Sequence, residues 1–311
     1  MKKKNLVSTL EATKLLLMGQ VVALPTETVY GLAGDATNEA ALKLIFKTKS
    51  RPLFDPLIMH VFDSSEINTW VSEWTPLHNF LAERFWPGPL TMVVPKKPTV
   101  SNLISAGLST VALRVPQHPL FREVLKNVGR PLAAPSANRF GKTSPTTVEH
   151  VLNEFEGQVP AVDGGPCSIG IESTVVKIDS RDQVPKVSIL RPGLISKEDL
   201  EEELKEYSHK VHVQFEGQNK ASPGTLEDHY QPRIPLLIYE QNQQAPPAGF
   251  FRGVEMNLNP DPFLAAREFY AHLHQLGQSD HDHIILRKFA ELDSPAWVAL
   301  KDRILKASLK N

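Results

Sequence analysis

The sequence predicts an α/β fold: a twisted mixed sheet with flanking helices, followed by a smaller α/β unit. Short apolar runs bounded by turn residues, such as residues 21–24 and 111–115, are typical of buried strands. Segments with apolar residues at helical spacing alternate with these runs, as in α/β and α+β proteins. Of the 311 residues, 41% are hydrophobic and 22% are charged, the balance of a globular protein that can bury a core.

The first predicted helix covers residues 6–19, where leucines recur near helical spacing and Gly19 ends the helix. A strand at residues 21–24 then leads into a polar turn. Asn38 can cap a second helix that runs to Lys47. The sheet is completed by strands at residues 57–61, 90–95, 111–115, 132–134, 173–178 and 187–190.

A charged helix at residues 198–207 closes the first domain, residues 1–207. Residues 208–235 are polar and rich in glycine, proline, asparagine and histidine, which indicates a linker. The second unit, residues 236–311, is small for an independent domain, so we expect it to dock on the first. Its predicted elements are strands at 236–239 and 284–286 and helices at 263–276 and 296–309.

Composition argues against several classes of protein. The formal net charge of −1 gives no global field toward nucleic acid or an anionic membrane, so any tRNA contact would be a local patch. Cys167 is the only cysteine and cannot form an intramolecular disulfide, which fits a reducing compartment. No apolar run reaches the roughly eighteen residues of a membrane helix, and polar residues interrupt the first fourteen positions. We therefore expect a cytoplasmic protein.

The first polar cluster contains Thr26, Glu27, Thr28 and Tyr30, with Gly31 after them. Ligands in open α/β sheets bind where strands end. A hydroxyl such as that of Thr28 can bind the amine or carboxylate of a small molecule, and glycine lets backbone approach it closely. The alternative is a turn whose hydroxyls bond its own backbone.

Lys47, Lys49 and Arg51 form a cationic cluster. Cations at alternate positions after a helix can meet one anion, and the arginine fork suits phosphate oxygens. On composition alone, a solvated basic helix end is the better interpretation. His60 lies between apolar neighbours on a strand, where a histidine is more often a core residue than a ligand.

Arg114 lies inside an apolar strand, which is costly unless an anion pairs with it. The sequence leaves open whether that anion belongs to the protein or to a ligand. Residues 134–138 form a loop whose backbone N–H groups can face phosphate or a nucleobase, although a plain turn has the same composition. Other polar clusters lie at residues 170–176, 190–193 and 221–232.

In their joint order, these motifs resemble those of the YrdC-type threonylcarbamoyl-AMP synthases. The motifs are L-P-T-E-T-V-Y-G-L (24–32), K-x-R-P (49–52), W-P-G-P-L-T (86–91), L-R-V-P (113–116), A-P-S-A-N (134–138), G-x-E-S-T-V (170–175) and L-R-P-G (190–193). S-P-G-x-x-x-x-H-Y-x-P at 222–232 resembles the linker of the two-domain version, which adds a smaller Rossmann-like domain. The resemblance spans nearly the whole chain and implies a YrdC-like sheet in the first domain.

Enzymes of this family condense L-threonine, bicarbonate or CO2, and ATP into threonylcarbamoyl-AMP and release pyrophosphate. The product feeds the tRNA threonylcarbamoyl transferase machinery. The resemblance therefore implies a nucleotidyltransferase that uses ATP with Mg²⁺, and it identifies no metal site made by the protein. Residues 221–232 would form a lid that keeps water from a labile threonine carbamate.

The resemblance also implies roles for individual residues. Lys49 and Arg51 would neutralise charge on the phosphates, with no covalent nucleophile. The L-threonine site would be lined by Thr28, His60, Arg114, Ala134 and Ser173. ATP would be contacted by Arg51, Asp55, Thr110, Ser136, Ser144, Arg191, His229 and Tyr230.

Two features depart from the family pattern. Asp55 stands where asparagine is more usual, and a carboxylate repels phosphates unless it binds a metal or a ribose hydroxyl. The linker carries Glu227 and Asp228 where the family usually has a basic, aromatic segment. A phosphate contact from this segment is therefore in doubt.

Three alternative functions or sites fit the sequence less well. Carbamoyltransferases of hydrogenase maturation share the fold but carry zinc-finger cysteine pairs, which a chain with one cysteine does not have. A nucleic-acid-binding module would need a basic patch that the net charge does not indicate. A zinc site among His272, His274, His281, Asp282 and His283 is disfavoured, because the first two point to different helix faces.

Overall fold

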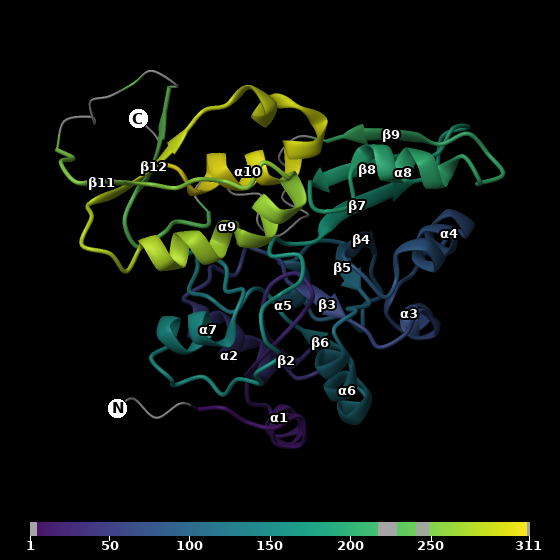
Figure 1. The fold of residues 1–311 in the computed structure, drawn as a ribbon. Helices are drawn as coiled ribbons and strands as arrows, with labels where there is room; N and C mark the ends of the chain where they lie inside the picture. The colour runs from purple at the N-terminus through teal and green to yellow at the C-terminus, as the bar shows by residue number, and fades with distance from the viewer. Residues whose placement is uncertain (1–4, 217–228, 241–242, 244–248, 310–311) are drawn as a thin grey trace.

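The computed structural model describes residues 5–216, 229–240, 243 and 249–309. It confirms the predicted class, since a nine-stranded mixed sheet with flanking helices is followed by a small parallel sheet of three strands (Figure 1). Among the described residues, none of the helices has both the length and the hydropathy that crossing a bilayer requires.

The first sheet has the strand order β1-β2-β6-β3-β5-β4-β7-β8-β9. Strands β3 and β5 are parallel, with His60 opposite Arg114, so their carboxyl ends meet at one edge. The bounds are β1 (Val22–Leu24), β2 (Gly31–Asp35), β3 (Ile58–His60), β4 (Leu90–Pro95), β5 (Thr110–Arg114), β6 (Leu132–Ala133), β7 (Thr174–Asp179), β8 (Lys186–Arg191) and β9 (His212–Phe215).

Strand β9 lies inside the range that the sequence predicts to be a linker. It pairs in parallel with β8, so the first sheet continues to Phe215. Strand β2 was not predicted, because its sequence belongs to the polar motif that follows β1. Its antiparallel pairing with β1 folds residues 25–30 into a turn at the end of the sheet.

Helices flank this sheet at α1 (Thr9–Leu17), α2 (Glu39–Lys49), α3 (Ile67–Trp70), α4 (Pro76–Phe85), α5 (Asn102–Ser105), α6 (Pro119–Val128), α7 (Val148–Glu154) and α8 (Lys197–Leu204), with a 3-10 turn η1 (Ser64–Glu66). The sequence prediction contained α1, α2 and α8 but missed α4, α6 and α7. Helix α6 is amphipathic and buries Phe121, Val124, Leu125 and Val128 in one core cluster with Leu16 of α1.

The C-terminal unit contains β10 (Leu236–Tyr239), β11 (Gly253–Glu255), α9 (Pro262–Leu276), β12 (His283–Arg287), η2 (Ala290–Asp293), η3 (Pro295–Trp297) and α10 (Val298–Ala307). Its parallel sheet has the order β10-β12-β11, and α9 is the crossover helix between β11 and β12. This is a βαβ arrangement, as expected for a Rossmann-like unit.

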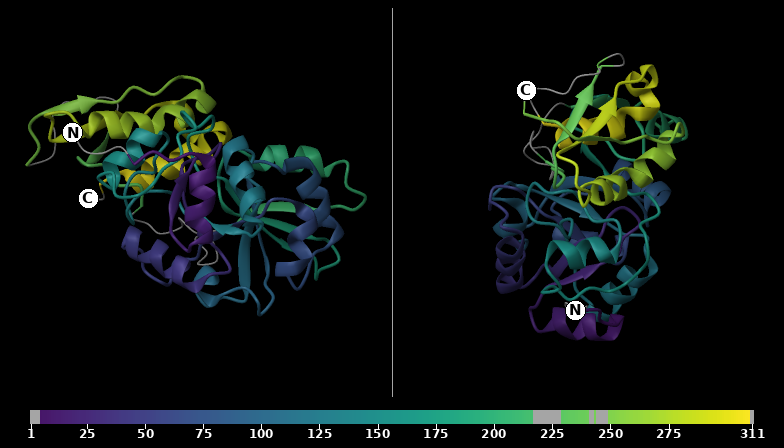
Figure 2. Two further views of the ribbon diagram at one scale, coloured as in Figure 1. Left: turned by 90° about the horizontal axis from the view of Figure 1, so that it is seen from below. Right: turned by 60° about the vertical axis from the view of Figure 1, so that its left-hand side comes forward.

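The C-terminal unit lies against one side of the first domain in both views of Figure 2. One core cluster joins Val29, Ile169 and Ile171 to Phe269 and Ile304 of the C-terminal helices. At Gly170, a Cβ atom would lie 2.4 Å from the backbone oxygen of Arg267 in α9. The loop that precedes β7 and helix α9 therefore meet backbone to backbone.

Candidate functional site

A small cavity lies where the carboxyl ends of β3 and β5 meet the turn after β1 and the loop before β7. Its volume is about 50 Å³. In this measure a water molecule needs roughly 10–15 Å³, so the cavity holds a few waters but no nucleotide. Ten of the residues that the resemblance implied line it: Thr28, Arg51, His60, Arg114, Ala134, Ser136, Ser173, Arg191, His229 and Tyr230.

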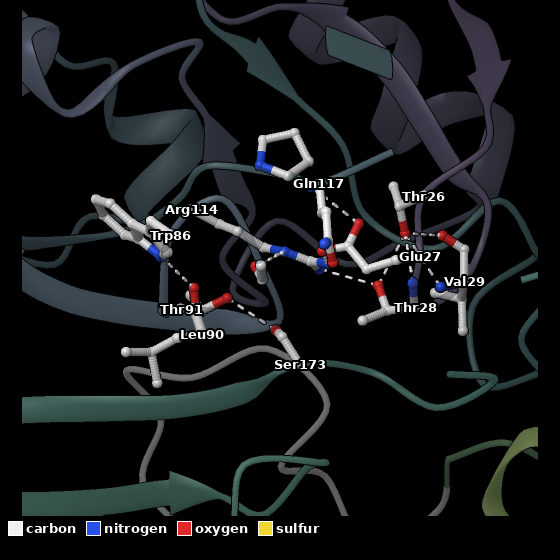
Figure 3. A network of polar contacts seen from close by, with 12 residues as sticks. Thr26, Glu27, Thr28, Val29, Trp86, Leu90, Thr91, Arg114, Gln117 and Ser173 are labelled. Carbon is white, nitrogen blue, oxygen red and sulfur yellow. Dashed lines mark hydrogen bonds and ion pairs between the residues drawn. The ribbon is translucent and has the colours of Figure 1, made fainter. Parts of the chain in front are cut away.

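Arg114 is held on three sides at one end of the cavity (Figure 3). Its Nη2 donates to Glu27 Oε1 at 2.6 Å, its Nη1 to Thr28 Oγ1 at 2.9 Å and its Nε to the carbonyl of Gly88 at 3.1 Å. The open question about this buried arginine is answered, because its anionic partner is an internal carboxylate. A guanidinium has five N–H donors, so two have no contact among the described residues.

Burial and charge set the protonation states beside Arg114. Burial would raise the pKa of Glu27, but the nearby Arg114 guanidinium outweighs it and the pKa is lowered. Burial, together with the charge of Arg114, lowers the pKa of His60 to about 3, so its imidazole is neutral. His60 Nδ1 has no hydrogen-bond partner among the described residues. The site therefore presents a neutral imidazole next to a charge-balanced ion pair.

The turn after β1 combines both interpretations that the sequence left open. Thr26 Oγ1 donates to the carbonyl of Val29 at 2.7 Å and accepts from the backbone N–H of Thr28, so it bonds its own turn. Thr28 faces the cavity. A Cβ atom at Gly31 would lie 3.2 Å from the Cβ of Ala134, so the glycine permits close approach of the two cavity walls.

Ser173 connects the residues that the family resemblance assigns to L-threonine with those that it assigns to ATP. Its hydroxyl lies 2.8 Å from that of Thr91 on β4, as Figure 3 shows, and accepts from Arg191 Nη2 at 3.0 Å. Arg191 also donates to the Ser173 carbonyl at 2.9 Å. Strands β4, β7 and β8 therefore hold this wall of the cavity together.

Arg51 and Lys49 lie in different surroundings, although they are two residues apart. The guanidinium of Arg51 lines the cavity and pairs with Asp55 at 2.8 Å. Lys49 is buried and its amine donates to the carbonyls of Ser136 and Asn138, away from the cavity lining. Burial and the charge of Arg51 hold the pKa of Lys49 well below its usual range. In this structure Lys49 fastens the loop behind Ser136.

Three other implied residues do not line the cavity. Asp55 is occupied by Arg51, and burial raises its pKa. Ser144 donates to Glu172 Oε1 at 2.6 Å, and Glu172 does line the cavity. Thr110 begins β5 at the end opposite Arg114, on the side where Pro56 precedes β3.

His229 and Tyr230 close one side of the cavity, whereas residues 221–228, including Glu227 and Asp228, lie outside the described residues. The Tyr230 carbonyl accepts from Thr143 Oγ1 at 3.1 Å, which anchors the segment to the loop before α7. Burial lowers the pKa of His229 to about 3. His229 Nδ1 and the Tyr230 hydroxyl are buried without a hydrogen-bond partner among the described residues.

Glu172 is the functional candidate that sequence reasoning passed over. It stands inside the motif at 170–175, yet only Ser173 was taken from that motif. Burial would raise the pKa of Glu172, but Arg303 and Arg191 outweigh it and lower the pKa to about 2. The signal in the sequence is a carboxylate that stands between an apolar residue, Ile171, and two hydroxyl residues at the start of a strand.

The histidine-rich C-terminal segment does not gather into a metal site. His274 stacks on His150 and meets the Ser144 carbonyl, while His283 contacts Asp282 and Tyr239. Within the described ranges, no group of three or more potential ligands is positioned to hold a metal ion.

Comparison with known proteins gives consistent matches along the chain. Residues 14–193 match the Sua5/YciO/YrdC family, described as telomere recombination. Residues 195–308 match the Sua5 C-terminal domain, described as threonylcarbamoyl-AMP synthase, C-terminal domain. A crystal structure of P. abyssi Sua5 complexed with L-threonine matches with a TM-score of 0.82 and 31% identity, over 96% of this chain and 94% of that chain.

Two curated relatives are both named threonylcarbamoyl-AMP synthase. The protein from Bacillus subtilis is 43% identical over 74% of this chain and 66% of its own length. The protein from Pyrococcus abyssi is 40% identical over 71% of this chain and 65% of its own length. The aligned part thus spans just under two thirds of these relatives.

Proposed function

The chain belongs to the Sua5/YciO/YrdC family, and on that premise we propose that it is an L-threonylcarbamoyladenylate synthase. The observation that carries the proposal is the convergence of distant motifs on one cavity. Residues from the first motif to the linker, more than 200 positions apart, converge on it. It combines an arginine with unused donors, a neutral imidazole and two further arginines, which suits an amino acid beside a polyphosphate.

The proposed reaction condenses the amine of L-threonine with bicarbonate to a carbamate, with loss of water. If CO2 is the donor, no water is lost. A carbamate oxygen then forms a bond to the α-phosphorus of ATP, and the bond from that phosphorus to its bridging oxygen breaks. Pyrophosphate leaves and threonylcarbamoyl-AMP remains for the downstream tRNA threonylcarbamoyl transferase machinery.

That the protein acts in the cytoplasm stays a prediction.

We assign the two ends of the cavity to the two substrates. Thr28, His60, Arg114, Ala134 and Ser173 would receive L-threonine, with the spare Arg114 donors on its carboxylate. Arg51, Ser136 and Arg191 would face ATP, and charge on the departing pyrophosphate would be stabilised by the two arginines. Asp55 and Ser144 would contribute through their contacts with Arg51 and Glu172, and Lys49 by fixing the loop of Ser136. An ATP contact at Thr110 stays a prediction, because Thr110 lies at the end of β5 opposite Arg114.

Mg²⁺ would accompany ATP on its phosphate oxygens rather than occupy a protein site. The carboxylates near the cavity do not fit a metal site, because Asp55 is held by Arg51 and Glu172 by Arg303. Mg²⁺ commonly binds through few protein ligands and substrate phosphates.

Pyrophosphate release tests the function directly. With ATP and Mg²⁺, we expect release only when both L-threonine and bicarbonate are present, and threonylcarbamoyl-AMP should be detected by mass spectrometry. L-serine and L-valine serve as controls, because each keeps only part of the threonine side chain. Release that does not depend on threonine would rule the proposal out. Salt-dependent tRNA binding without turnover would favour a nucleic-acid-binding module.

We further propose that residues 208–235 include a lid over the nucleotide. The 50 Å³ cavity cannot admit ATP while His229 and Tyr230 fill its side, so the two must move for ATP to bind. Tyr230→Phe keeps the ring and removes only a hydroxyl that lacks a partner among the described residues.

Substitutions in the proposed lid should therefore lower activity without unfolding the protein. We expect His229→Ala and Tyr230→Ala to reduce threonine-dependent turnover by about 10²-fold, because water enters and the geometry loosens. Tyr230→Phe should have a smaller effect. His281→Ala is the control, since His281 is exposed and contacts only Ser279 among the described residues. Unchanged turnover and unchanged ATP affinity in both alanine variants would end the lid proposal.

A further inference from the structure

Glu172 joins the two parts of the protein at the edge of the cavity. Its Oε2 accepts from Arg303 Nε at 2.8 Å and its Oε1 from Ser144 Oγ at 2.6 Å. The hydroxyl of Tyr270 lies 3.1 Å from Oε2 and 3.3 Å from Oε1. Arg303 belongs to α10 and Tyr270 to α9, so the C-terminal unit supplies two of the three hydrogen-bond partners that Glu172 has among the described residues.

This contact is built inside the protein. Arg303 and Tyr270 are fully buried, and Glu172 is 7% exposed. Replacing buried ion pairs by apolar side chains is often neutral or stabilising, so stability alone is a weak reason for such a pair. The pair adjoins Arg191, and the Arg303 guanidinium lies over the Tyr230 ring at 5.5 Å from its centre. Both neighbours line the cavity.

The charge balance of the cavity explains what Arg303 contributes. Without Arg303, an ionised Glu172 would stand next to bound phosphates and repel them, and it would attract Arg191 away from them. With Arg303 in place, the carboxylate is neutralised from behind. Arg51 and Arg191, which both line the cavity, then face it beside a carboxylate that already has a cationic partner.

We propose that Arg303 and Tyr270 are positioning residues for the nucleotide half of the site, acting through Glu172. The C-terminal unit thereby supplies the counter-charge that makes the cavity suitable for a polyphosphate. This inference rests on the proposed function, because it assumes that ATP binds there. Two residues before Glu172, the backbone of Gly170 approaches the backbone of α9 closely.

ATP affinity and L-threonine affinity, each measured by calorimetry on the full-length protein, distinguish this positioning role from a purely structural one, which would affect both ligands. Arg303→Met should weaken ATP binding at least tenfold, or about 1.4 kcal/mol, while L-threonine affinity changes less than twofold. Tyr270→Phe should weaken ATP binding by a smaller factor, because it removes one hydrogen bond and no charge. Arg287→Met is the matched control, since Arg287 pairs with Glu255 within the C-terminal unit.

The decisive variant is the double substitution Glu172→Gln with Arg303→Met. If Arg303 acts by neutralising Glu172, removing both charges should restore ATP affinity to within about threefold of the wild type. A packing role would leave the double variant as weak as Arg303→Met. If Arg303→Met alone melts early, comparing Glu172→Gln with the double variant gives the same answer, because both lack the unpaired carboxylate.

Provided that the wild-type protein binds ATP and releases pyrophosphate, two results with the variants would overturn the inference. One is wild-type ATP affinity in a folded Arg303→Met variant. The other is a loss of affinity that Glu172→Gln fails to relieve. A wild-type protein that does not bind ATP would instead refute the proposed function.

Discussion

Replacing Arg114 by methionine is expected to abolish threonine-dependent pyrophosphate release and to lower the free energy of unfolding by about 3–5 kcal/mol. The stability loss has a specific cause. Glu27 would remain buried without its partner, and the Thr28 hydroxyl and Gly88 carbonyl would each lose a donor. The activity loss follows because the proposed carboxylate-binding donors are removed.

A second substitution separates these two effects. In the double variant Glu27→Gln with Arg114→Met, the unpaired charge is gone, so most of the lost stability should return while activity stays absent. Urea unfolding gives the first quantity and pyrophosphate release the second.

Arg122→Met is the control for this pair of variants. Arg122 donates only to the backbone carbonyls of Phe62 and Pro116, and no carboxylate depends on it among the described residues. Turnover in Arg114→Met, or a stability loss that Glu27→Gln does not reverse, would contradict this account.

The position of the site was predictable because its residues stand at the ends of apolar strands. His60 and Arg114 close β3 and β5, and the parallel pairing of these strands brings them side by side. What the sequence could not supply was the partner of each charge. Glu27 lies 87 residues before Arg114, and Arg303 lies 131 residues after Glu172, so no local spacing connects them.

Lys49 and Arg51 show what local spacing leaves open. Cations at Lys47, Lys49 and Arg51 can meet one anion or form a solvated helix end, and the burial of Lys49 and Arg51 contradicts the solvated helix end for these two. Ser50 between them adopts φ 50°, a left-handed conformation that ends α2. The turn sends Lys49 toward the loop carbonyls and Arg51 toward the cavity. A residue with a positive φ that is not glycine cannot be identified from spacing alone.

Helix α6 was missed although its signals were present. His118 caps it, Pro119 occupies its first turn and Gly129 ends it at φ 65°. The apolar spacing at residues 121, 124, 125 and 128 is that of an amphipathic helix. The signals of α6 are therefore all local in the sequence, whereas the partners in the buried ion pairs can be identified only in the folded chain.

The second large effect is expected at Gly193, which follows β8. A Cβ atom there would lie 2.3 Å from the backbone nitrogen of Thr174, 2.6 Å from the carbonyl carbon of Ser173 and 2.8 Å from the Glu172 oxygen. All three are backbone atoms, so no side-chain rotation relieves the clash. Gly193→Ala must therefore displace the start of β7, which carries the cavity wall at Ser173.

We expect Gly193→Ala to destabilise the protein by about 1–3 kcal/mol and to reduce kcat/KM at least ~10²-fold, since a displacement of about 1 Å is enough for such a loss. Gly34→Ala is the matched control. A Cβ at Gly34 meets the terminal Cδ1 of Ile45 at 3.1 Å, a side-chain end rather than backbone, so Gly34→Ala should destabilise the protein less than Gly193→Ala. Because the substitution displaces the cavity wall rather than only weakening substrate binding, saturating concentrations of ATP and L-threonine should not restore turnover in Gly193→Ala. Wild-type turnover in that variant would show that the wall at Ser173 tolerates displacement and does not position a substrate.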